Sequence, residues 1–289
     1  MKTSLPSLSL VALLTISLVA VTRAQSPPAT DDAATAEPKT TPVTYHIGAE
    51  EFEGCFAEPA KSTVGSAGAV PGVLVVHDWT GLGPFAQARA VQLAKLGYIA
   101  FAADMYGKGK RASQNDRAAA GALAKPFYQD FSLFRVRAQA ALAELLKRPG
   151  VDPQRIGAIG FCFGGTTVLE LARSGADMKG VVSFHGGLKS PNTADAKNVK
   201  GRLLVLHGSL DPSVPPADVA GFMTEMNTAG VAYKLVAYPR SVHAFTNPEA
   251  GTDISKGVAY NAQAAEAAYG EMRQFFSEIF AGGAPSAQP

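Results

Sequence analysis

A run of small and apolar residues near the middle of the chain constrains the fold more than any other segment. An apolar stretch, residues 155–161, leads into Gly160-Phe-Cys-Phe-Gly-Gly165 and continues as a helical pattern to about residue 173. Small residues two positions before and two positions after Cys162 allow a strand and a helix to approach at a sharp, strained turn. This Gly-x-Cys-x-Gly spacing is typical of a nucleophile elbow in which cysteine replaces serine.

Two interpretations of this turn are open from the segment alone. In the functional one, the first free N–H groups of the following helix point at the Cys162 thiol, where they favour thiolate and can stabilise an oxyanion. In the structural one, the turn is an ordinary glycine-rich link between strand and helix, and the cysteine is buried and inert. The remainder of the chain decides between them.

Composition limits the size and the partners of the protein. The chain has 289 residues, of which 47% are hydrophobic, and α/β folds of this size commonly form a single domain. The formal net charge is +2, only 17% of the residues are charged, and no basic stripe is present. The sequence therefore predicts neither a nucleic-acid partner nor an anionic membrane surface, and a monomer is favoured.

The first 24 residues predict a secretory signal. Lys2 precedes a short apolar run, and Thr22-Arg-Ala24 supplies small residues where a signal peptidase cuts. A membrane anchor is the alternative, but the run is short for a span and is interrupted by proline and serine. No cysteine lies near the cleavage site for lipid attachment. We therefore expect a secreted or periplasmic protein that is not inserted in a membrane after cleavage.

Two flanking segments contain almost nothing to bury. Residues 25–42 are rich in Pro, Ala, Thr and Asp, which predicts a flexible leader. Residues 281–289 predict a frayed tail for the same reason. The folded domain is therefore expected over residues 43–280.

Within that domain, apolar runs alternate with helical patterns. Residues 43–47 and 51–57 predict an opening hairpin around Gly48. Further strands are expected at 71–77, 98–104, 155–161, 178–184, 202–207 and 232–238. Helices are expected at 84–96, 115–124, 127–147, 164–173, 216–229 and 260–280. Strands separated by helices in this way predict an α/β fold, with a mostly parallel central sheet flanked by helices on both faces.

The ends of two later strands carry an acid and a base. Asp211 stands in a turn just past the strand at 202–207, and His243 stands in the loop past the final strand. The order Cys162, Asp211, His243 is the nucleophile, acid and histidine order of α/β-hydrolases. In such a triad His243 takes the thiol proton and later protonates the leaving group, while Asp211 fixes the imidazole tautomer. The other histidines are expected in the core or at the mouth of the site: His46, His77, His185 and His207.

Over residues 43–280 the chain resembles the dienelactone hydrolase family of α/β-hydrolases. The matching segments are Gly160-Phe-Cys-Phe-Gly-Gly165, His207-Gly-Ser-Leu-Asp-Pro-Ser-Val-Pro215, His243-Ala-Phe245, Ala103-Asp-Met-Tyr-Gly107 and Val75-Val-His-Asp-Trp79. The resemblance implies a Cys-His-Asp hydrolase that acts on ester or lactone carbonyls through an acyl-thioester. It also implies an oxyanion hole formed by the backbone N–H groups of Phe163 and Trp79.

The chain departs from the family's pattern at three positions. Asp78 stands where the family usually has a Glu that helps to activate the thiol, and its side chain is one methylene shorter. Lys108 and Asn247 stand where dienelactone hydrolases hold a substrate carboxylate with arginines; Lys lacks the bidentate fork and Asn lacks charge. A neutral or less acidic ester or lactone is therefore favoured as substrate. The expected substrate mouth consists of Trp79, Tyr106, Lys108, Phe245 and Asn247.

Three other functions are alternatives. A binding or thiol-sensing protein that keeps the fold without turnover would have an unreactive Cys162. A redox thiol would need a resolving cysteine, but Cys55 belongs to an early strand, where it is expected to be a small core residue and not a disulfide partner. A metal hydrolase would need a His-x-His or His-Glu-x-x-His pair, and neither occurs. The sequence therefore predicts an exported ester or lactone hydrolase without cofactor or metal.

Overall fold

The computed structural model describes Met1, residues 37–60 and residues 68–281. The predicted signal, most of the predicted leader and the tail from residue 282 lie outside these residues. The description concerns the unit to which residues 37–60 and 68–281 belong.

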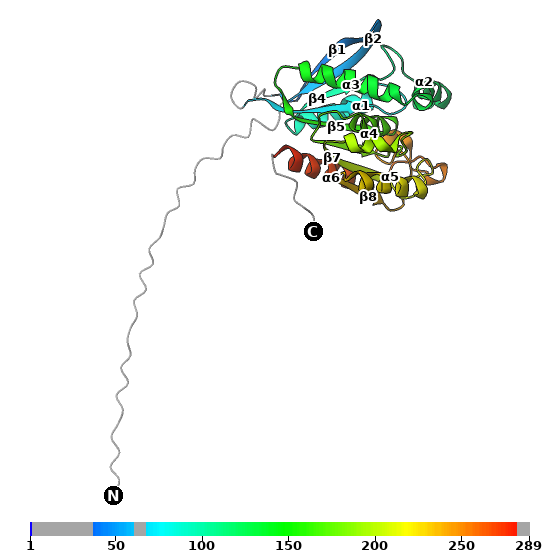
Figure 1. Ribbon diagram of the computed structural model, residues 1–289. Coiled ribbons are helices and arrows are strands. Elements are labelled where there is room, and N and C mark those ends of the chain that lie inside the picture. The colour runs from blue at the N-terminus through cyan, green and yellow to red at the C-terminus, as the bar shows by residue number, and fades with distance from the viewer. Residues whose placement is uncertain (2–36, 61–67, 282–289) are drawn as a thin grey trace. The chain divides into compact units, whose positions relative to one another are not determined.

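A mostly parallel sheet forms the centre of this unit (Figure 1). Within the described residues it has eight strands, in the order β1-β2-β4-β3-β5-β6-β7-β8. Strands β1 and β2 pair antiparallel with each other, as do β2 and β4, and all other neighbours are parallel. The strands are β1 (Lys39–Ile47), β2 (Glu50–Glu58), β3 (Val70–Val76), β4 (Ile99–Ala103), β5 (Val151–Phe161), β6 (Gly180–Phe184), β7 (Arg202–Gly208) and β8 (Tyr233–Tyr238).

Helices cover both faces of the sheet (Figure 1). They are α1 (Pro84–Lys95), α2 (Arg117–Gln129), α3 (Ser132–Lys147), α4 (Phe163–Arg173), α5 (Pro216–Ala229) and α6 (Ala262–Phe280), with short 3₁₀ helices η2 (Thr193–Asn198), η3 (Pro248–Ala250) and η4 (Ile254–Lys256). Buried side chains of α2 to α5 share one core, whereas those of α1 and α6 share another. This confirms the predicted α/β fold. Among the described helices, none combines the length and apolar character of a membrane span.

Several predicted boundaries differ from the structure; β5, for example, begins at Val151, before the predicted 155. Strand β1 begins at Lys39, inside the predicted leader, because its backbone pairs with β2 as far as Glu58 although its own side chains are polar. The predicted helix at 127–147 is two helices, and Phe127 belongs to α2. The break lies at Asp130, whose carboxylate accepts the backbone N–H of Ser132 (2.9 Å) and starts α3.

The turn between β5 and α4 is anchored in both cores. Phe161, at the end of β5, packs in the core of α1 and α6, where its ring stacks on Phe184 with centroids 4.7 Å apart. Phe163, at the start of α4, packs in the other core against Phe127 and Phe134. Both side chains are fully buried. Each contributes about 1.5–3 kcal/mol of burial free energy, so the residue between them is held from both sides.

The C-terminal end of α4 carries a buried ion network. The Arg173 guanidinium, whose side chain is 1% exposed, donates two hydrogen bonds of 2.8 Å to Glu225 of α5 and one of 3.0 Å to Glu170. It also donates to the Leu188 carbonyl, in the loop after β6 (3.2 Å). Glu170 in turn accepts from Arg135 of α3. The network therefore fixes α4 against two helices and the loop after β6.

Breaking this network is expected to destabilise the fold strongly. Arg173→Met leaves the buried Glu225 carboxylate without its cation, which costs about 3–5 kcal/mol of unfolding free energy. The matched control is Arg273→Met, since the Arg273–Glu266 pair lies on the surface of α6 and is worth less than about 1 kcal/mol. Urea unfolding measures both. Equal losses from the two variants would contradict the assigned role of the network.

Candidate active site

The sharp turn predicted at residues 160–165 is present, with Cys162 at its apex. Cys162 has φ 53° and ψ −111°, a backbone conformation that side-chain-bearing residues rarely adopt. The flanking glycines are sterically required. A Cβ on Gly160 would lie 2.0 Å from the Gly164 carbonyl oxygen, and one on Gly164 would lie 2.4 Å from the Val76 carbonyl oxygen. The strand–turn–helix packing therefore depends on the glycine spacing seen in the sequence.

Three side chains from separate loops meet at this turn. His243, in the loop after β8, places Nε2 2.9 Å from the Cys162 sulfur. The other ring nitrogen, Nδ1, lies 2.8 Å from Oδ2 of Asp211, in the turn after β7. Oδ1 of Asp211 accepts the backbone N–H of Ser213 (2.8 Å), which orients the carboxylate. The structure thus brings together all three residues of the predicted triad, in hydrogen-bonding contact.

The surroundings of His243 favour its charged form. Burial alone lowers the pKa of this imidazole, but the Cys162 sulfur and the Asp211 carboxylate outweigh burial and raise the pKa to about 10. A histidine with this pKa carries its proton at neutral pH. The arrangement can therefore hold an imidazolium next to a sulfur nucleophile and can donate a proton to a leaving group.

The two backbone N–H groups of the predicted oxyanion hole are unpaired within the described residues. Among the described residues, the N–H groups of Phe163 and Trp79 have no hydrogen-bond partner. Phe163 opens α4, directly after Cys162. The Trp79 peptide is fixed by Tyr106, whose hydroxyl donates to the Trp79 carbonyl (3.0 Å). Unpaired N–H groups, such as that of Phe163 at a helix start and that of Trp79 in the loop after β3, are suited to bind a developing oxyanion.

A cavity of about 740 Å³ opens over the sulfur at the carboxyl ends of the strands. Cavities of this size hold small organic molecules. Cys162 and His243 line it, together with Trp79, Arg117, Tyr128, Asn247 and Lys256.

Of the predicted mouth residues, Trp79 and Asn247 line the cavity, and the other three lie elsewhere. Lys108 pairs with Glu51 of β2 (3.2 Å), because the Lys108 N–H also donates to the Glu51 carbonyl and draws this turn towards β2. Phe245 is fully buried, packed on the ring of His185. Tyr106 is buried behind Trp79.

Several residues of the cavity were not among the predicted site residues, and three of them carry polar or charged groups that face a ligand-sized space: Arg117, Tyr128 and Lys256. Arg117 begins α2, and its guanidinium lies 5.2 Å from the centre of the Trp79 ring. Tyr128 lies on α2, and burial together with the nearby Cys162 raises its pKa. Lys256 ends η4. The cations of residues 108–117 (Lys108, Lys110, Arg111 and Arg117) are a sequence signal for Arg117 alone, and no motif marks Tyr128 or Lys256.

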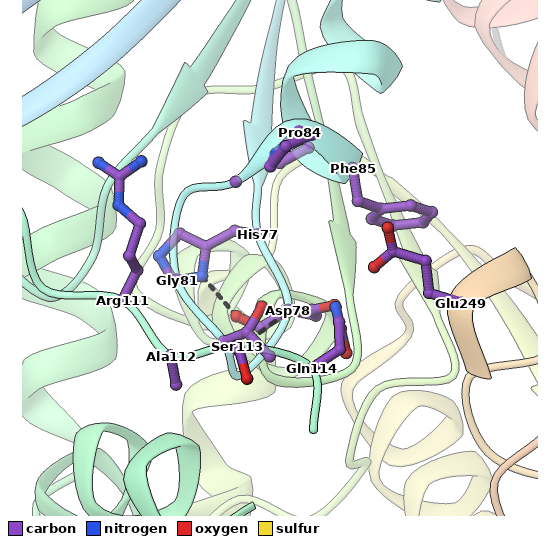
Figure 2. A pocket seen from close by; sticks show the side chains of 13 residues that line it. His77, Asp78, Gly81, Pro84, Phe85, Arg111, Ala112, Ser113, Gln114 and Glu249 are labelled. Atoms are coloured by element: carbon purple, nitrogen blue, oxygen red, sulfur yellow. Dashed lines mark hydrogen bonds between the residues drawn. The ribbon is translucent and has the colours of Figure 1, made fainter. Parts of the chain in front are cut away.

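Asp78 lines both the main cavity and a smaller one of about 200 Å³, shown in Figure 2. Its Oδ1 accepts from the N–H and the hydroxyl of Thr80, and its Oδ2 accepts from Gln114 (3.2 Å). The carboxylate has these partners and no hydrogen bond to the Cys162 sulfur. His77, beside it, contacts the Asp78 carbonyl and accepts the Met105 N–H (3.0 Å), so it ties the end of β3 to the end of β4.

Comparison with known proteins places this site in a family. Residues 52–280 match the model of the dienelactone hydrolase family. A solved structure named m3DLH is 36% identical and has a TM-score of 0.79, covering 84% of this chain and 99% of its own. A dienelactone hydrolase-like promiscuous phosphotriesterase from metagenomic libraries is 38% identical, with a TM-score of 0.78 and the same coverage. A protein of Synechocystis, provisionally named carboxymethylenebutenolidase, is 28% identical over 84% of this chain and 98% of its own. The chain belongs to the dienelactone hydrolase family.

Proposed function

We propose that the protein hydrolyses small carboxylic esters or lactones, with Cys162 as the nucleophile. The observation that carries the proposal is the continuous contact from the Cys162 sulfur through His243 to Asp211. The cavity over the sulfur and the family of hydrolases to which the chain belongs support it. An inert cysteine would need neither an oriented imidazole nor a buried carboxylate behind it.

In the first half of the reaction, the Cys162 sulfur attacks the carbonyl carbon. A C–S bond forms, and the carbonyl π electrons move to the oxygen. The resulting oxyanion accepts hydrogen bonds from the backbone N–H groups of Phe163 and Trp79. The His243 imidazolium then donates its proton to the leaving oxygen as the C–O bond breaks. An alcohol departs and the acyl group remains on sulfur as a thioester.

In the second half, neutral His243 takes a proton from water, which attacks the thioester carbonyl. The C–S bond breaks, the acid departs, and the sulfur anion and imidazolium are restored. Asp211 holds the imidazole in the tautomer whose Nε2 faces the sulfur and stabilises its charge in both halves. Asp78 has Thr80 and Gln114 as partners, so we assign the initial activation of the thiol to His243.

The residues of the cavity wall bear on the charge of the substrate's acyl part. Lys108 pairs with Glu51 of β2 and does not line the cavity, and Asn247 is neutral, which favours a neutral ester or lactone. Arg117 and Lys256 nevertheless bring positive charge to the cavity wall. A matched pair of p-nitrophenyl esters, butyrate and monosuccinate, separates the two cases, because only the second carries a carboxylate. We expect butyrate to have the higher kcat/KM.

Turnover and its pH dependence test the proposal. We expect release of p-nitrophenol by the wild type, with kcat/KM that falls as the pH rises through about 10, where His243 loses its proton. Asp211→Asn should move this alkaline limb to lower pH, because the carboxylate helps to raise the His243 pKa.

A panel of esters, lactones and one aryl phosphotriester defines the range of substrates. The phosphotriester is included because a relative is named a phosphotriesterase. Absence of hydrolysis of every compound in the panel would overturn the proposal.

The predicted signal supports export as a further part of this proposal. Its basis is the sequence of residues 1–24 alone. Intact mass of the protein recovered from its native host tests it: loss of about 24 residues supports cleavage, and a full-length chain opposes it.

A further inference from the structure

A second histidine lies against the nucleophile turn and has no part in the mechanism above. His185 follows β6, is 2% exposed and lines the main cavity. Its ring centre lies 5.4 Å from that of His243, edge to face, and 5.3 Å from that of Phe245. It is therefore buried between the turn that carries the sulfur and the loop that carries the base.

Both ring nitrogens of His185 are engaged, one with each loop. Nδ1 lies 3.1 Å from the backbone nitrogen of Cys162, and Nε2 lies 2.8 Å from the hydroxyl of Thr246. A backbone N–H can only donate, so Nδ1 is the acceptor and the ring proton resides on Nε2. Burial, and next the neighbouring His243 charge, lower the pKa of His185 well below its ordinary value, which keeps the ring neutral.

The backbone around this bridge is strained. Among the described residues, four non-glycine residues have positive φ, and three of them belong to this junction: Cys162 (53°), His185 (42°) and Ala244 (56°). Such conformations persist only where surrounding contacts fix them. The Cys162 N–H is shared between Nδ1 of His185 and the Phe184 carbonyl (3.0 Å), so the segment at the end of β6 supplies both of its acceptors.

We propose that His185 is a positioning residue, which ties the backbone of Cys162 to the loop of His243 and Thr246 and thereby keeps the sulfur within hydrogen-bonding reach of the catalytic imidazole. The inference rests on the proposed function, in which Cys162 is the nucleophile. It adds a fourth side chain, outside the triad, that sets the separation between nucleophile and base.

The test compares variants that keep or remove the acceptor. His185→Phe keeps a ring but removes both hydrogen bonds, whereas His185→Asn can place Oδ1 where Nδ1 was. For p-nitrophenyl butyrate we expect His185→Phe to lower kcat by about 10- to 100-fold, with KM changed by less than about threefold. His185→Asn should stay within about threefold of wild type, and Thr246→Val should lose about threefold. The control is His46→Phe, the same change on β1, where the imidazole is exposed.

Alkylation of Cys162 by iodoacetamide, followed by mass spectrometry from pH 5 to 10, gives a second readout that needs no substrate. The titratable side chains that act on His185 are His243 and His207, and Cys162 contacts its ring through the backbone nitrogen. We expect His185→Phe to slow alkylation at neutral pH by about tenfold and to shift its pH profile, and His46→Phe to leave both close to wild type.

Two results would overturn the inference: a folded His185→Phe protein with unchanged kcat and alkylation profile, or a His185→Asn protein as impaired as His185→Phe. If His185→Phe shows no cooperative thermal melt, it is not folded. The comparison is then between His185→Asn, which keeps an acceptor for the Cys162 N–H, and Thr246→Val, which removes the partner of Nε2. If the wild type is alkylated yet hydrolyses no ester, the proposed function fails while the alkylation series still tests the role of His185.

Discussion

Cys162→Ala is expected to reduce kcat/KM for a p-nitrophenyl ester by about 10³-fold or more, with no loss of folding. The sulfur is the only atom of the site that forms a covalent bond to the substrate in the proposed mechanism, and removal of a nucleophile from a triad has effects of this size. Alanine retains the Cβ, so the packing of the turn between Phe161 and Phe163 is preserved. Initial rates, beside a thermal melt of each protein, measure the effect.

The matched control is Cys55→Ala, which removes the other cysteine of the chain. Cys55 is half-buried in β2, where its thiol donates to the Phe56 carbonyl and not to a triad residue, and burial raises its pKa. We expect this variant to retain wild-type activity within about twofold, because alanine fits in the space of a buried thiol. If Cys162→Ala retained its activity, or if Cys55→Ala lost it, the assignment of the nucleophile would be wrong.

Gly164→Ala is expected to prevent formation of a stable fold. The added Cβ would lie 2.4 Å from the Val76 carbonyl oxygen and 2.5 Å from that of His77, both of which are fixed backbone atoms of β3 and its end. Neither oxygen can move without opening the sheet. We therefore expect the free energy of unfolding to fall by more than about 4 kcal/mol, a loss typical of severe core substitutions. Soluble yield and the urea midpoint measure it.

Gly221→Ala is the control for this prediction. Gly221 also lies in a helix, α5, but a Cβ at this position would meet nothing within 4 Å. Alanine is a better helix former than glycine, so this variant should gain about 0.5–1 kcal/mol. A Gly164→Ala protein as stable as the wild type would show that the helix does not need to approach β3 so closely.

Much of the fold was readable because the sequence pattern is regular. Continuous apolar runs such as Val73–Val76 identify strands that are covered on both faces, and Pro216 at the start and Gly230 just after the end of α5 mark that helix to the residue. Less was readable where backbone pairing, not side-chain pattern, decides the structure. The first residues of β1 are polar and are a strand only because β2 continues opposite them.

The site divides in the same way. The triad positions follow from chain order and strand ends, since each residue stands just past the carboxyl end of a parallel strand. The residues of the cavity's side walls do not follow from chain order or strand ends. Arg117 and Tyr128 come from α2, whose place over the sulfur depends on the path of the preceding loop. His185 stands at a strand end like the triad residues. The contacts of its two ring nitrogens, however, depend on a positive φ, and sequence patterns do not predict a positive φ at a non-glycine residue.

The central claim is that the acyl group passes through the Cys162 sulfur, and rapid-quench mass spectrometry tests it most directly. The protein is mixed with p-nitrophenyl acetate, quenched in acid within the first turnover, digested and mapped. We expect one acetyl group on the peptide that contains Cys162, removable by hydroxylamine, absent in Cys162→Ala and more abundant when His243→Gln slows deacylation. Turnover of the ester with no acyl group on this peptide in either the wild type or the His243 variant would contradict the proposed mechanism.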